Sequence, residues 1–406
     1  MKEKKKIPEL RFPGFSGEWV EKKIGDYVEI ISGIGFKASE YSKSGIPLLR
    51  IDNVSYGKII WESIAYLPEH YLTRFPNLHL KAEDILLALN RPITQGQLKI
   101  SKLGKNNEPS ILYQRVGKFV FKSDNVLPSF AYFLFSLHIK AFVEKTSLGS
   151  DQPFISTVEL KKYSTLIPFS KKEQTKIANF LSDIDSKIEK LTKKKELMEQ
   201  YKKGMMQTLF SREIRFKDEN GNDYPDWEEK IANEIFDNIT DKNHNGDLPL
   251  LAVTQDQGVV DREAAGIEIK TSQQSIQSYK MIDKGDFVIS LRSFQGGIEY
   301  SNLKGISSPA YTVLRPKIKI SDNFYKAYFK KEEFISKLNN AVIGIRDGKQ
   351  ISYGVFSDMR IPYPSFPEQE KIANFLNIFD KKIEQIDKEL CGVKEFKKGL
   401  LQKMFV

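Results

Sequence analysis

Residues 173–181 read Glu173-Gln-Thr-Lys-Ile-Ala-Asn-Phe-Leu181, and residues 368–376 read Glu368-Gln-Glu-Lys-Ile-Ala-Asn-Phe-Leu376. The two stretches differ at one of nine positions and lie 195 residues apart. At the same offset, Lys202-Lys-Gly-Met-Met-Gln-Thr-Leu-Phe210 matches Lys397-Lys-Gly-Leu-Leu-Gln-Lys-Met-Phe405. A repeat that keeps one spacing over this length indicates that the chain contains two copies of one structural unit.

The repeated stretches also carry a helical pattern. Apolar residues recur at alternating steps of four and three, which is the spacing of a coiled-coil seam. They are Ile177, Leu181, Ile184, Ile188, Leu191, Met198 and Met205 in the first copy, and Ile372, Leu376, Phe379, Ile383, Ile386, Leu390, Val393 and Leu400 in the second. Pro168 and Pro367 stand just before the two patterns, where a helix start is expected. The sequence therefore predicts two helices of about 38 residues each.

Two arrangements would bury these apolar stripes. Each helix could pack on its own globular unit, or the two helices could pack on each other. A helix of this length would extend about 57 Å, and a small domain rarely covers so much length, which favours packing of the helices on each other. Lys195, Lys202 and Lys397 interrupt the stripes. The run Lys193-Lys-Lys195 is interpreted as a solvated face rather than a binding surface.

A fainter repeat precedes each helix. Both halves open alike, with Arg11-Phe12 leading to Trp19 and Arg215-Phe216 leading to Trp227. Further pairs are Pro47-Leu-Leu49 with Pro249-Leu-Leu251, Lys81-Ala-Glu-Asp84 with Lys284-Gly-Asp286, Pro109 with Pro309, and Arg115 with Arg315. The offset falls from 208 at the tryptophans to 195 at the helices, so the first globular unit is 13 residues longer. Because surface loops accept insertions at low cost, we interpret the globular units as one scaffold that carries different loops.

The globular units mix strand-like and helix-like runs. Strands are expected at 47–51, 85–89, 119–121, 287–291 and 311–314, and short helices at 129–135 and 324–329. The expected fold is therefore mixed α/β (α+β), with a twisted sheet in each unit. The predicted organisation is a globular unit at 1–165, a helix at 166–212, a second globular unit at 213–360 and a second helix at 361–406.

Polar loops after the predicted strands are the candidate DNA-contacting sites. Arg, Asn and Gln can make paired hydrogen bonds to guanine or adenine edges, whereas Lys holds phosphates. The candidates are Asn90, Arg91, Gln95, Gln97, Lys99 and Gln152 in the first unit, and Arg292, Ser293, Gln295, Arg346, Lys349 and Gln350 in the second. Arg292 follows its strand at the position that Asn90 holds in the first unit. Ordinary polar turns are the alternative interpretation of these loops.

Composition limits the class of protein and its partners. The chain has 406 residues, a net charge of +10, 40% hydrophobic residues and one cysteine, Cys391. The positive charge favours an anionic partner such as nucleic acid, and the single cysteine excludes disulfides within the chain and cysteine-rich zinc sites. The basic N-terminus leads into no apolar segment, so no signal peptide is predicted. No apolar run approaches the roughly 20 residues of a membrane span, and a soluble, cytoplasmic protein is expected.

Motifs of DNA-modifying enzymes are missing from the sequence. A methyltransferase needs a glycine-rich loop for S-adenosylmethionine and an Asn/Asp-Pro-Pro-aromatic turn for the flipped base, and neither Gly33-Ile-Gly35 nor Ile361-Pro-Tyr-Pro364 has that form. The GxxxxGK[ST] phosphate loop is absent. Acidic residues around Asp226 and Glu268 fit a metal-dependent nuclease poorly, and the four histidines show no ligand spacing. The chain is therefore expected to be non-catalytic, with no metal and no cofactor of its own.

The duplicated unit resembles the specificity subunit of type I restriction–modification systems. Each copy is followed by Glu-Gln-x-Lys-Ile-Ala-Asn-Phe-Leu and ends in Lys-Lys-Gly-x-x-Gln-x-x-Phe, and the opening Leu10-Arg-Phe-Pro-Gly-Phe-Ser-Gly-Glu-Trp19 is also typical of that family. The resemblance covers essentially the whole chain. It implies two target-recognition domains, each binding one part of a split DNA sequence. It also implies that the helices pair as an antiparallel coiled coil, set the gap and dock the partners.

The same resemblance implies the partners. Two methyltransferase subunits would bind S-adenosylmethionine and methylate adenine, and two motor-nuclease subunits would use ATP and magnesium to translocate and cut DNA. Double-stranded DNA and these subunits are the expected partners, with no membrane. The expected partner-binding residues of the helices are Ile177, Leu181, Ile184, Ile188, Ile372, Leu376, Phe379 and Ile383. Two alternatives stay open: a stand-alone DNA-binding regulator, and a nuclease or methylase with its own recognition domain.

Overall fold

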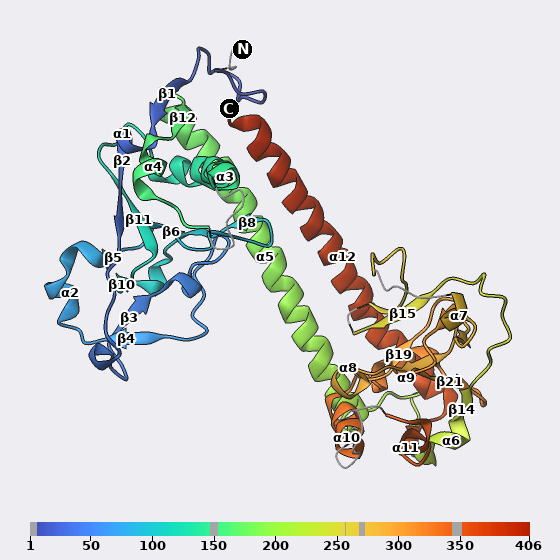
Figure 1. The fold of residues 1–406 in the computed structure, drawn as a ribbon. Helices are drawn as coiled ribbons and strands as arrows, with labels where there is room; N and C mark the ends of the chain where they lie inside the picture. Colours follow the sequence, from blue (N-terminus) through green and yellow to red (C-terminus); the bar gives the residue numbers. More distant parts are fainter. Residues whose placement is uncertain (1–5, 147–152, 256, 268–272, 343–350) are drawn as a thin grey trace. The chain divides into compact units, whose positions relative to one another are not determined.

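The computed structural model describes residues 6–146, 153–255, 257–267, 273–342 and 351–406 (Figure 1). The chain divides into two compact units. The first unit consists of Met1–Leu191 and Glu389–Val406, and the second unit consists of Thr192–Lys388. Each unit combines a globular segment with parts of both long helices, so the unit boundaries fall within the helices.

Two four-stranded sheets form the globular part of the first unit. The antiparallel sheet has the order β2-β11-β6-β9, with strands at Val28–Ser32, Val116–Phe121, Ile85–Ala88 and Ile100–Lys102. The mixed sheet has the order β4-β3-β10-β5, with strands at Ala65–Leu67, Ile46–Leu49, Ser110–Leu112 and His79–Leu80. In that sheet β10 runs parallel to β3 and antiparallel to β5. A separate pair, β1 (Val20–Lys23) and β12 (Ser164–Ile167), joins the two ends of the globular segment.

The second unit repeats this plan with shorter strands. Its antiparallel sheet has the order β14-β21-β18-β19, with strands at Phe236–Ile239, Thr312–Pro316, Phe287–Ile289 and Glu299–Tyr300. The other pairs are β13 (Glu228–Ile231) with β22 (Arg360–Tyr363), β15 (Leu251–Thr254) with β16 (Gly258–Asp261), and β17 (Lys280–Ile282) with β20 (Gly305–Ser307). Leu250 forms a parallel bridge with Ile306, as Leu48 does with Ile111. This shared register confirms the predicted correspondence of residues 47–49 with 249–251.

Helices cover the sheets in both units. In the first unit α3 (Pro128–Thr146) buries Phe130 and Phe135, and in the second unit α9 (Asp322–Tyr328) buries Phe324. The shorter helices are α1 (Ile24–Tyr27), α2 (Tyr71–Arg74), α4 (Thr157–Lys162), α6 (Ala232–Ile235), α7 (Gln273–Ile276), α8 (Ser293–Gly296), α10 (Glu332–Val342) and α11 (Tyr353–Ser357). The mixed α/β fold is thus confirmed, and every predicted strand and helix has a counterpart. The strands β12 and β22 extend past the predicted ends of the globular units at 165 and 360.

Two of the faint sequence correspondences are wrong. Pro109 directly precedes β10, whereas Pro309 follows β20, the strand that matches β10 in register. Arg115 lies in the turn before β11 with a φ of 67°, whereas Arg315 lies inside β21 and faces Asp237 across the strand pair. Single residues in loops of different length do not fix an alignment, because an insertion on either side shifts them freely.

The two long helices, α5 (Lys171–Phe210) and α12 (Phe366–Met404), each contribute to both cores. In the first unit the start of α5 buries Ile177 and Leu181, and the segment at the end of α12 buries Leu400 and Phe405. The second unit mirrors this arrangement with Leu209 and Phe210 from the end of α5 and with Ile372 and Leu376 from the start of α12. The apolar stripes therefore pack on the globular segments as well as along the partner helix.

Ion pairs inside each unit show that the helices run antiparallel, as expected. In the second unit Lys195 Nζ lies 2.6 Å from Asp387 and Lys202 Nζ lies 2.5 Å from Asp380. The residue number of the paired aspartate on α12 thus falls as the residue number of the lysine on α5 rises. In the first unit Lys397 Nζ lies 2.5 Å from Asp185. At the repeat offset of 195, Lys202 matches Lys397 and Asp185 matches Asp380, so these are two copies of one ion pair. The lysines that interrupt the apolar stripes are neutralised by aspartates of the facing helix.

The glutamate of each repeated motif ties its helix to the opening segment. Glu173, which is 2% exposed, accepts hydrogen bonds from Arg11 Nε at 2.8 Å and Nη2 at 2.9 Å. Glu368, which is 0% exposed, accepts them from Arg215 Nε at 3.1 Å and Nη2 at 3.0 Å. Trp19 Nε1 also donates to Glu173 at 3.3 Å.

The glutamine of the motif is a second tie. Gln174 accepts a hydrogen bond from Leu127 N at 2.8 Å and donates to Pro168 O at 3.0 Å. Gln369 accepts one from Ser321 N at 2.9 Å and donates to Pro364 O at 2.8 Å. Both amides are fully buried, and buried polar groups need such partners. The buried glutamate and glutamine of the repeated motif therefore attach each long helix to its globular segment.

Candidate nucleic-acid interface

Acidic turns position the strands that lead into the candidate loops. Asp84 accepts a hydrogen bond from Lys81 N at 2.7 Å and pairs with Lys118, 2.6 Å away, just before β6. In the second unit Asp286 pairs with Arg315 at 2.7 Å just before β18. Hydrogen bonding to this buried carboxylate raises the pKa of Arg315 above its usual range. The strands β6 and β18 are thus fixed at their starts, and their ends present Asn90 and Arg292.

In the first unit the predicted loop is a β-hairpin. The strands β7 (Ile93–Thr94) and β8 (Gln97–Leu98) pair through a two-residue turn at Gln95 and Gly96, whose φ angles are 52° and 71°. Two positive φ angles are the signature of the tight turn that suits a twisted hairpin. Gln95 and Gln97 are exposed. The hairpin therefore displays two amide side chains on a short and well-defined projection.

A neighbouring segment brings two predicted loops together. Arg91 N donates to Pro153 O at 2.9 Å, and Ile155 N donates to Leu89 O at 2.8 Å. The segment that follows Gln152 thus lies beside the base of the hairpin, although Gln152 itself lies outside the described residues. Arg91 is exposed and Asn90 is partly exposed.

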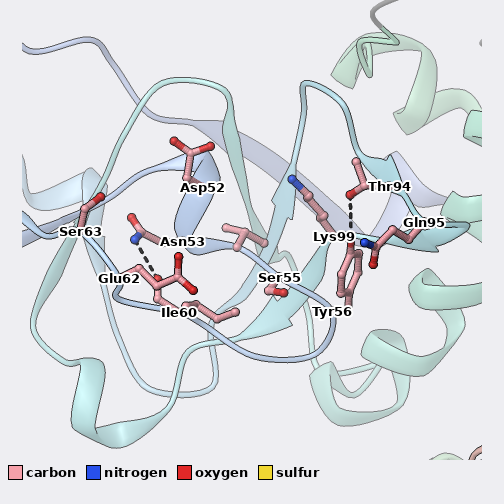
Figure 2. Close-up of a pocket in the computed structure, with 11 residues that line it drawn as sticks. Asp52, Asn53, Ser55, Tyr56, Ile60, Glu62, Ser63, Thr94, Gln95 and Lys99 are labelled. Atoms are coloured by element: carbon pink, nitrogen blue, oxygen red, sulfur yellow. Dashed lines mark hydrogen bonds between the residues drawn. The ribbon is translucent and has the colours of Figure 1, made fainter. Parts of the chain in front are cut away.

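The hairpin forms one side of a pocket of about 460 Å³ (Figure 2). Gln95 and Lys99 line it on this side, and Asp52 and Glu62 line it from the short helix η2 (Ile51–Asn53) and the loop that follows. Tyr56 Oη donates to Thr94 Oγ1 at 2.7 Å and so connects the loop to the hairpin. Two predicted residues, Gln95 and Lys99, thus meet two carboxylates that the sequence analysis missed.

In the second unit the corresponding loop contains a short helix. Arg292 is exposed and stands directly before α8, and Gln295 is exposed within α8. Ser293 is 1% exposed, and its Oγ accepts a hydrogen bond from Ser290 N at 2.8 Å. The prediction that Ser293 contacts DNA is therefore wrong, because its hydroxyl is used inside the fold to close the turn after β18.

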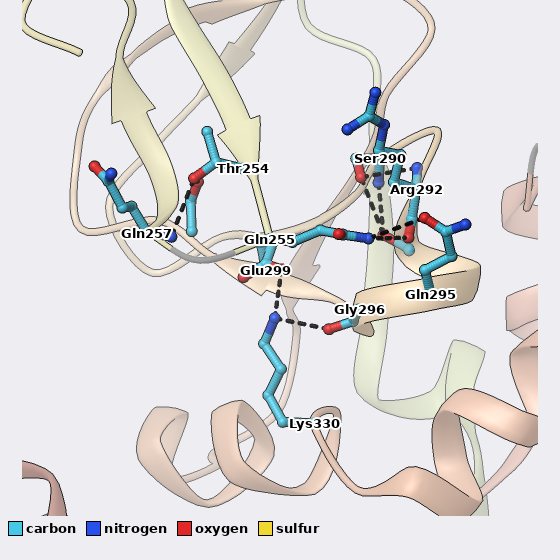
Figure 3. A network of polar contacts seen from close by, with 11 residues as sticks. Thr254, Gln255, Gln257, Ser290, Arg292, Gln295, Gly296, Glu299 and Lys330 are labelled. Atoms are coloured by element: carbon cyan, nitrogen blue, oxygen red, sulfur yellow. Dashed lines mark hydrogen bonds and ion pairs between the residues drawn. The ribbon is translucent and has the colours of Figure 1, made fainter. Parts of the chain in front are cut away.

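A glutamine from the turn after β15 contacts this loop. Gln255 Nε2 lies 3.2 Å from Arg292 O and 3.4 Å from Gln295 Oε1, to both of which it donates (Figure 3). Gln255 and Gln257 are exposed in the turn between β15 and β16. The sequence analysis missed both residues. The signal was the Gln257-Gly258 dipeptide between two strand-like runs, which resembles Gln95-Gly96.

Lys330 also attaches the α8 loop to the rest of the second unit. Lys330 Nζ donates to Gly296 O at 2.8 Å and pairs with the buried carboxylate of Glu299 (Figure 3). Gly297 has a φ of 79°, and a Cβ there would lie 2.1 Å from Phe329 O. Only glycine fits such a position. The loop that carries Arg292 and Gln295 is therefore attached on two sides.

The remaining predicted residues fall into two groups. Arg346, Lys349 and Gln350 lie outside the described residues. The predicted partner-binding residues of the helices lie inside the chain's own packing: Ile177, Leu181, Ile184, Ile372, Leu376 and Phe379 are buried, and Ile188 and Ile383 are partly buried. The buried six stabilise this chain, and their burial leaves them no surface for another subunit.

The described parts of the chain contain neither a metal-binding cluster nor a membrane-spanning helix. There, no group of three or more His, Cys, Asp or Glu side chains is arranged to hold a metal ion. Within the same residues, no helix is long and apolar enough to cross a membrane.

Comparison with known proteins finds a matching family and several relatives. Residues 16–199 and again 225–393 match the family described as type I restriction modification DNA specificity domain. The MjaVIII specificity subunit of Methanocaldococcus jannaschii is 44% identical over 204 residues, which are 50% of this chain and 48% of that protein. The match thus spans about half of that relative. The putative MjaX specificity subunit of the same organism is 25% identical over 410 residues, covering 95% of this chain and 92% of its own.

The fold has a solved counterpart. The crystal structure of a type I restriction–modification S subunit from M. genitalium aligns with a TM-score of 0.61 at 17% identity, over 98% of this chain and 99% of that one. At this identity the likeness concerns the fold.

Proposed function

The chain belongs to the type I restriction–modification DNA specificity family, and we propose that each of its two units reads one half of a split DNA site. The observation that carries the proposal is a pair of different polar loops at equivalent places in one scaffold. Asn90 follows β6, and Arg292 follows β18 at the matching position. Asn suits adenine and Arg suits guanine in the major groove, as readers of two different half-sites would require.

The long helices would set the gap between the half-sites. A continuous helix contributes to both units, and its length is fixed by its residue count at 1.5 Å per residue. Ion pairs such as Lys202–Asp380 and the buried motif residues fix the register of the helices within each unit. A spacing device needs such a fixed register, since slippage by one turn would alter the distance between bases.

The helices would also dock two methyltransferase subunits. Tyr201 on α5 and Phe396 on α12 occupy the same position of the helical repeat and are 56% and 57% exposed. An exposed aromatic side chain at both copies of one position suits two copies of one partner, because aromatic residues are favoured anchors of interfaces. The methyltransferase and motor-nuclease subunits would carry out the chemistry that uses S-adenosylmethionine, ATP and magnesium. This chain would supply the sequence specificity.

Mapping of methylated adenines in a host with and without this gene tests the proposal. The expected result is a bipartite motif with a constant gap that disappears with the gene. A continuous motif, or a map that does not depend on the gene, would contradict it. Co-purification with a methyltransferase subunit separates this function from that of a stand-alone regulator.

A further inference from the structure

We propose that the pocket of the first unit reads a G·C base pair, with its carboxylates accepting from cytosine and Lys99 donating to guanine. This inference rests on the proposed function, since it assumes that the hairpin side of the first unit faces DNA. It assigns a role to Asp52 and Glu62, which line the pocket together with Gln95 and Lys99 (Figure 2).

The four polar side chains are available for a ligand. Among the described residues, Asp52, Glu62, Gln95 and Lys99 have no hydrogen bond or ion pair through their side chains. Asp52, Glu62 and Gln95 are exposed, and Lys99 is partly exposed. Opposite charges that share a pocket without pairing are poised to bind complementary groups of a third partner.

Hydrogen bonds fix the loop segments that carry the two carboxylates. Asn53 accepts a hydrogen bond from Arg50 N at 2.8 Å and donates to Ile60 O at 2.9 Å, which closes the loop after Asp52. Glu62 lies between two anchored neighbours. Trp61 Nε1 donates to Asn107 Oδ1 at 2.8 Å, and Ser63 Oγ accepts from Arg50 Nη2 at 2.8 Å. Neither carboxylate takes part in these hydrogen bonds, so the folding of the loop does not explain why Asp52 and Glu62 are acidic.

Electrostatics makes carboxylates on such a surface informative. Duplex DNA carries one negative charge per about 1.7 Å of its axis, so an unpaired carboxylate facing it weakens binding to any sequence. A base edge compensates only where it offers a donor, and the cytosine N4 amino group is the donor that Asp and Glu accept from. The guanine of the same pair offers O6 and N7 as acceptors for a lysine. A carboxylate wall with a lysine opposite thus matches one G·C pair.

The second unit serves as an internal contrast. The shared register matches Leu48 with Leu250. Beyond these residues the chain forms η2 (Ile51–Asn53) in the first unit and the strand β15 (Leu251–Thr254) in the second. The backbone that carries Asp52 therefore differs between the units, and the half-site read by the second unit should not depend on Asp52 or Glu62.

The experiment uses the full chain assembled with its methyltransferase subunits and a duplex carrying the mapped motif. Asp52→Ala, Glu62→Ala, the double variant and Lys99→Met are compared with Glu69→Ala, an exposed carboxylate of the same unit outside the pocket. Dissociation constants are measured at fixed salt for the cognate duplex, for duplexes with each G·C pair of the first half-site changed to A·T, and for an unrelated duplex. The double variant should bind the unrelated duplex more tightly than the unaltered complex does. It should also lose roughly tenfold in discrimination at one G·C pair.

A second measurement needs no variant. Replacing the cytosine of that pair by a 2-pyrimidinone nucleoside, which lacks the 4-amino group, should weaken binding of the unaltered complex but not of the double variant. The inference is overturned if the first half-site contains no essential G·C pair, or if the double variant behaves like Glu69→Ala. If the unaltered complex does not distinguish the cognate from the unrelated duplex at all, the proposed function itself fails.

Discussion

The two units continue equivalent strands in different ways. After β6 the first unit forms a hairpin beside a pocket whose lining includes Asp52, Glu62, Gln95 and Lys99. After β18 the second unit forms a short helix that Gln255 and Lys330 attach to its surroundings. Below these loops the units agree closely, since Arg11–Glu173 and Gln174 return as Arg215–Glu368 and Gln369. The repeated residues attach the helices to the globular segments, whereas Arg91, Gln95, Arg292 and Gln295 of the differing loops are exposed.

Exchange of a whole unit would give the largest effect. Residues 20–167 include both β1 and β12, whose pairing closes the first globular segment. Replacing them by the matching segment of a relative should give a new first half-site while the second half-site and the gap stay unchanged. Specific binding exceeds non-specific binding roughly 10³–10⁷-fold, so the change in the methylation map should be complete. A change in both halves of the motif would show that the units are not independent readers.

Removal of the arginine that pairs with the buried glutamate should destabilise the second unit more than the first. Arg215→Met leaves Glu368 buried without its cation, which costs about 3–5 kcal/mol. Arg11→Met should cost less, because Glu173 keeps the hydrogen bond from Trp19 Nε1. In the second unit Trp227 Nε1 has no hydrogen-bond partner among the described residues. Denaturant unfolding of both variants measures the difference, and equal losses would refute the role of Trp19.

Substitution of a single loop residue should have the next largest effect. Arg292→Ala should cost roughly 1–3 kcal/mol at one base pair of the second half-site and leave assembly intact. The second unit, Thr192–Lys388, has equal numbers of basic and acidic residues, so its net charge is 0 and the first unit carries the +10 of the chain. The second unit thus has less general attraction to phosphate and should depend more on each base contact. Binding to a panel of single-base substitutions checks this, with Lys194→Ala on α5 as control. A uniform loss across the panel would assign Arg292 to phosphate binding or folding.

The cross-helix ion pairs should show the smallest effects. Lys202→Met and Lys397→Met each remove a pair whose lysine side chain is 23% exposed, and such partly exposed pairs contribute about 0.2–1 kcal/mol. Lys397→Met should cost slightly more, because Lys397 Nζ also lies 5.6 Å from the centre of the Phe133 ring. Thermal unfolding measures both variants. A loss above about 2 kcal/mol for either would show that the pair acts as a buried one.

The sequence predicts the regular parts of this molecule well. Strands such as β6 and helices such as α5 are recognisable because an apolar pattern records them directly. The candidate site is less predictable. Arg292 and Ser293 are adjacent and both polar, yet only the folded turn shows that one is exposed and the other bonds Ser290. Asp52 was missed because its neighbour in the pocket, Lys99, lies far along the chain.

The helices illustrate the same limit. The seven-residue pattern identifies Ile177 and Leu181 as apolar contacts, but it does not name the surface that they meet. In the structure that surface is mainly the globular segment of the same unit. A stripe of this kind is satisfied by any apolar surface, so burial within the chain and contact with a partner leave the same trace in sequence.

The use of each helix by both cores has a consequence for synthesis. The second unit is one continuous stretch, Thr192–Lys388, so its core is complete once that stretch has left the ribosome. The first unit starts earlier but needs Leu400, Met404 and Phe405 to cover Trp19 and Phe130. At translation rates of about 5–20 residues per second, roughly 10–40 s pass between Leu191 and Glu389. The part of the chain that is made first is therefore completed last.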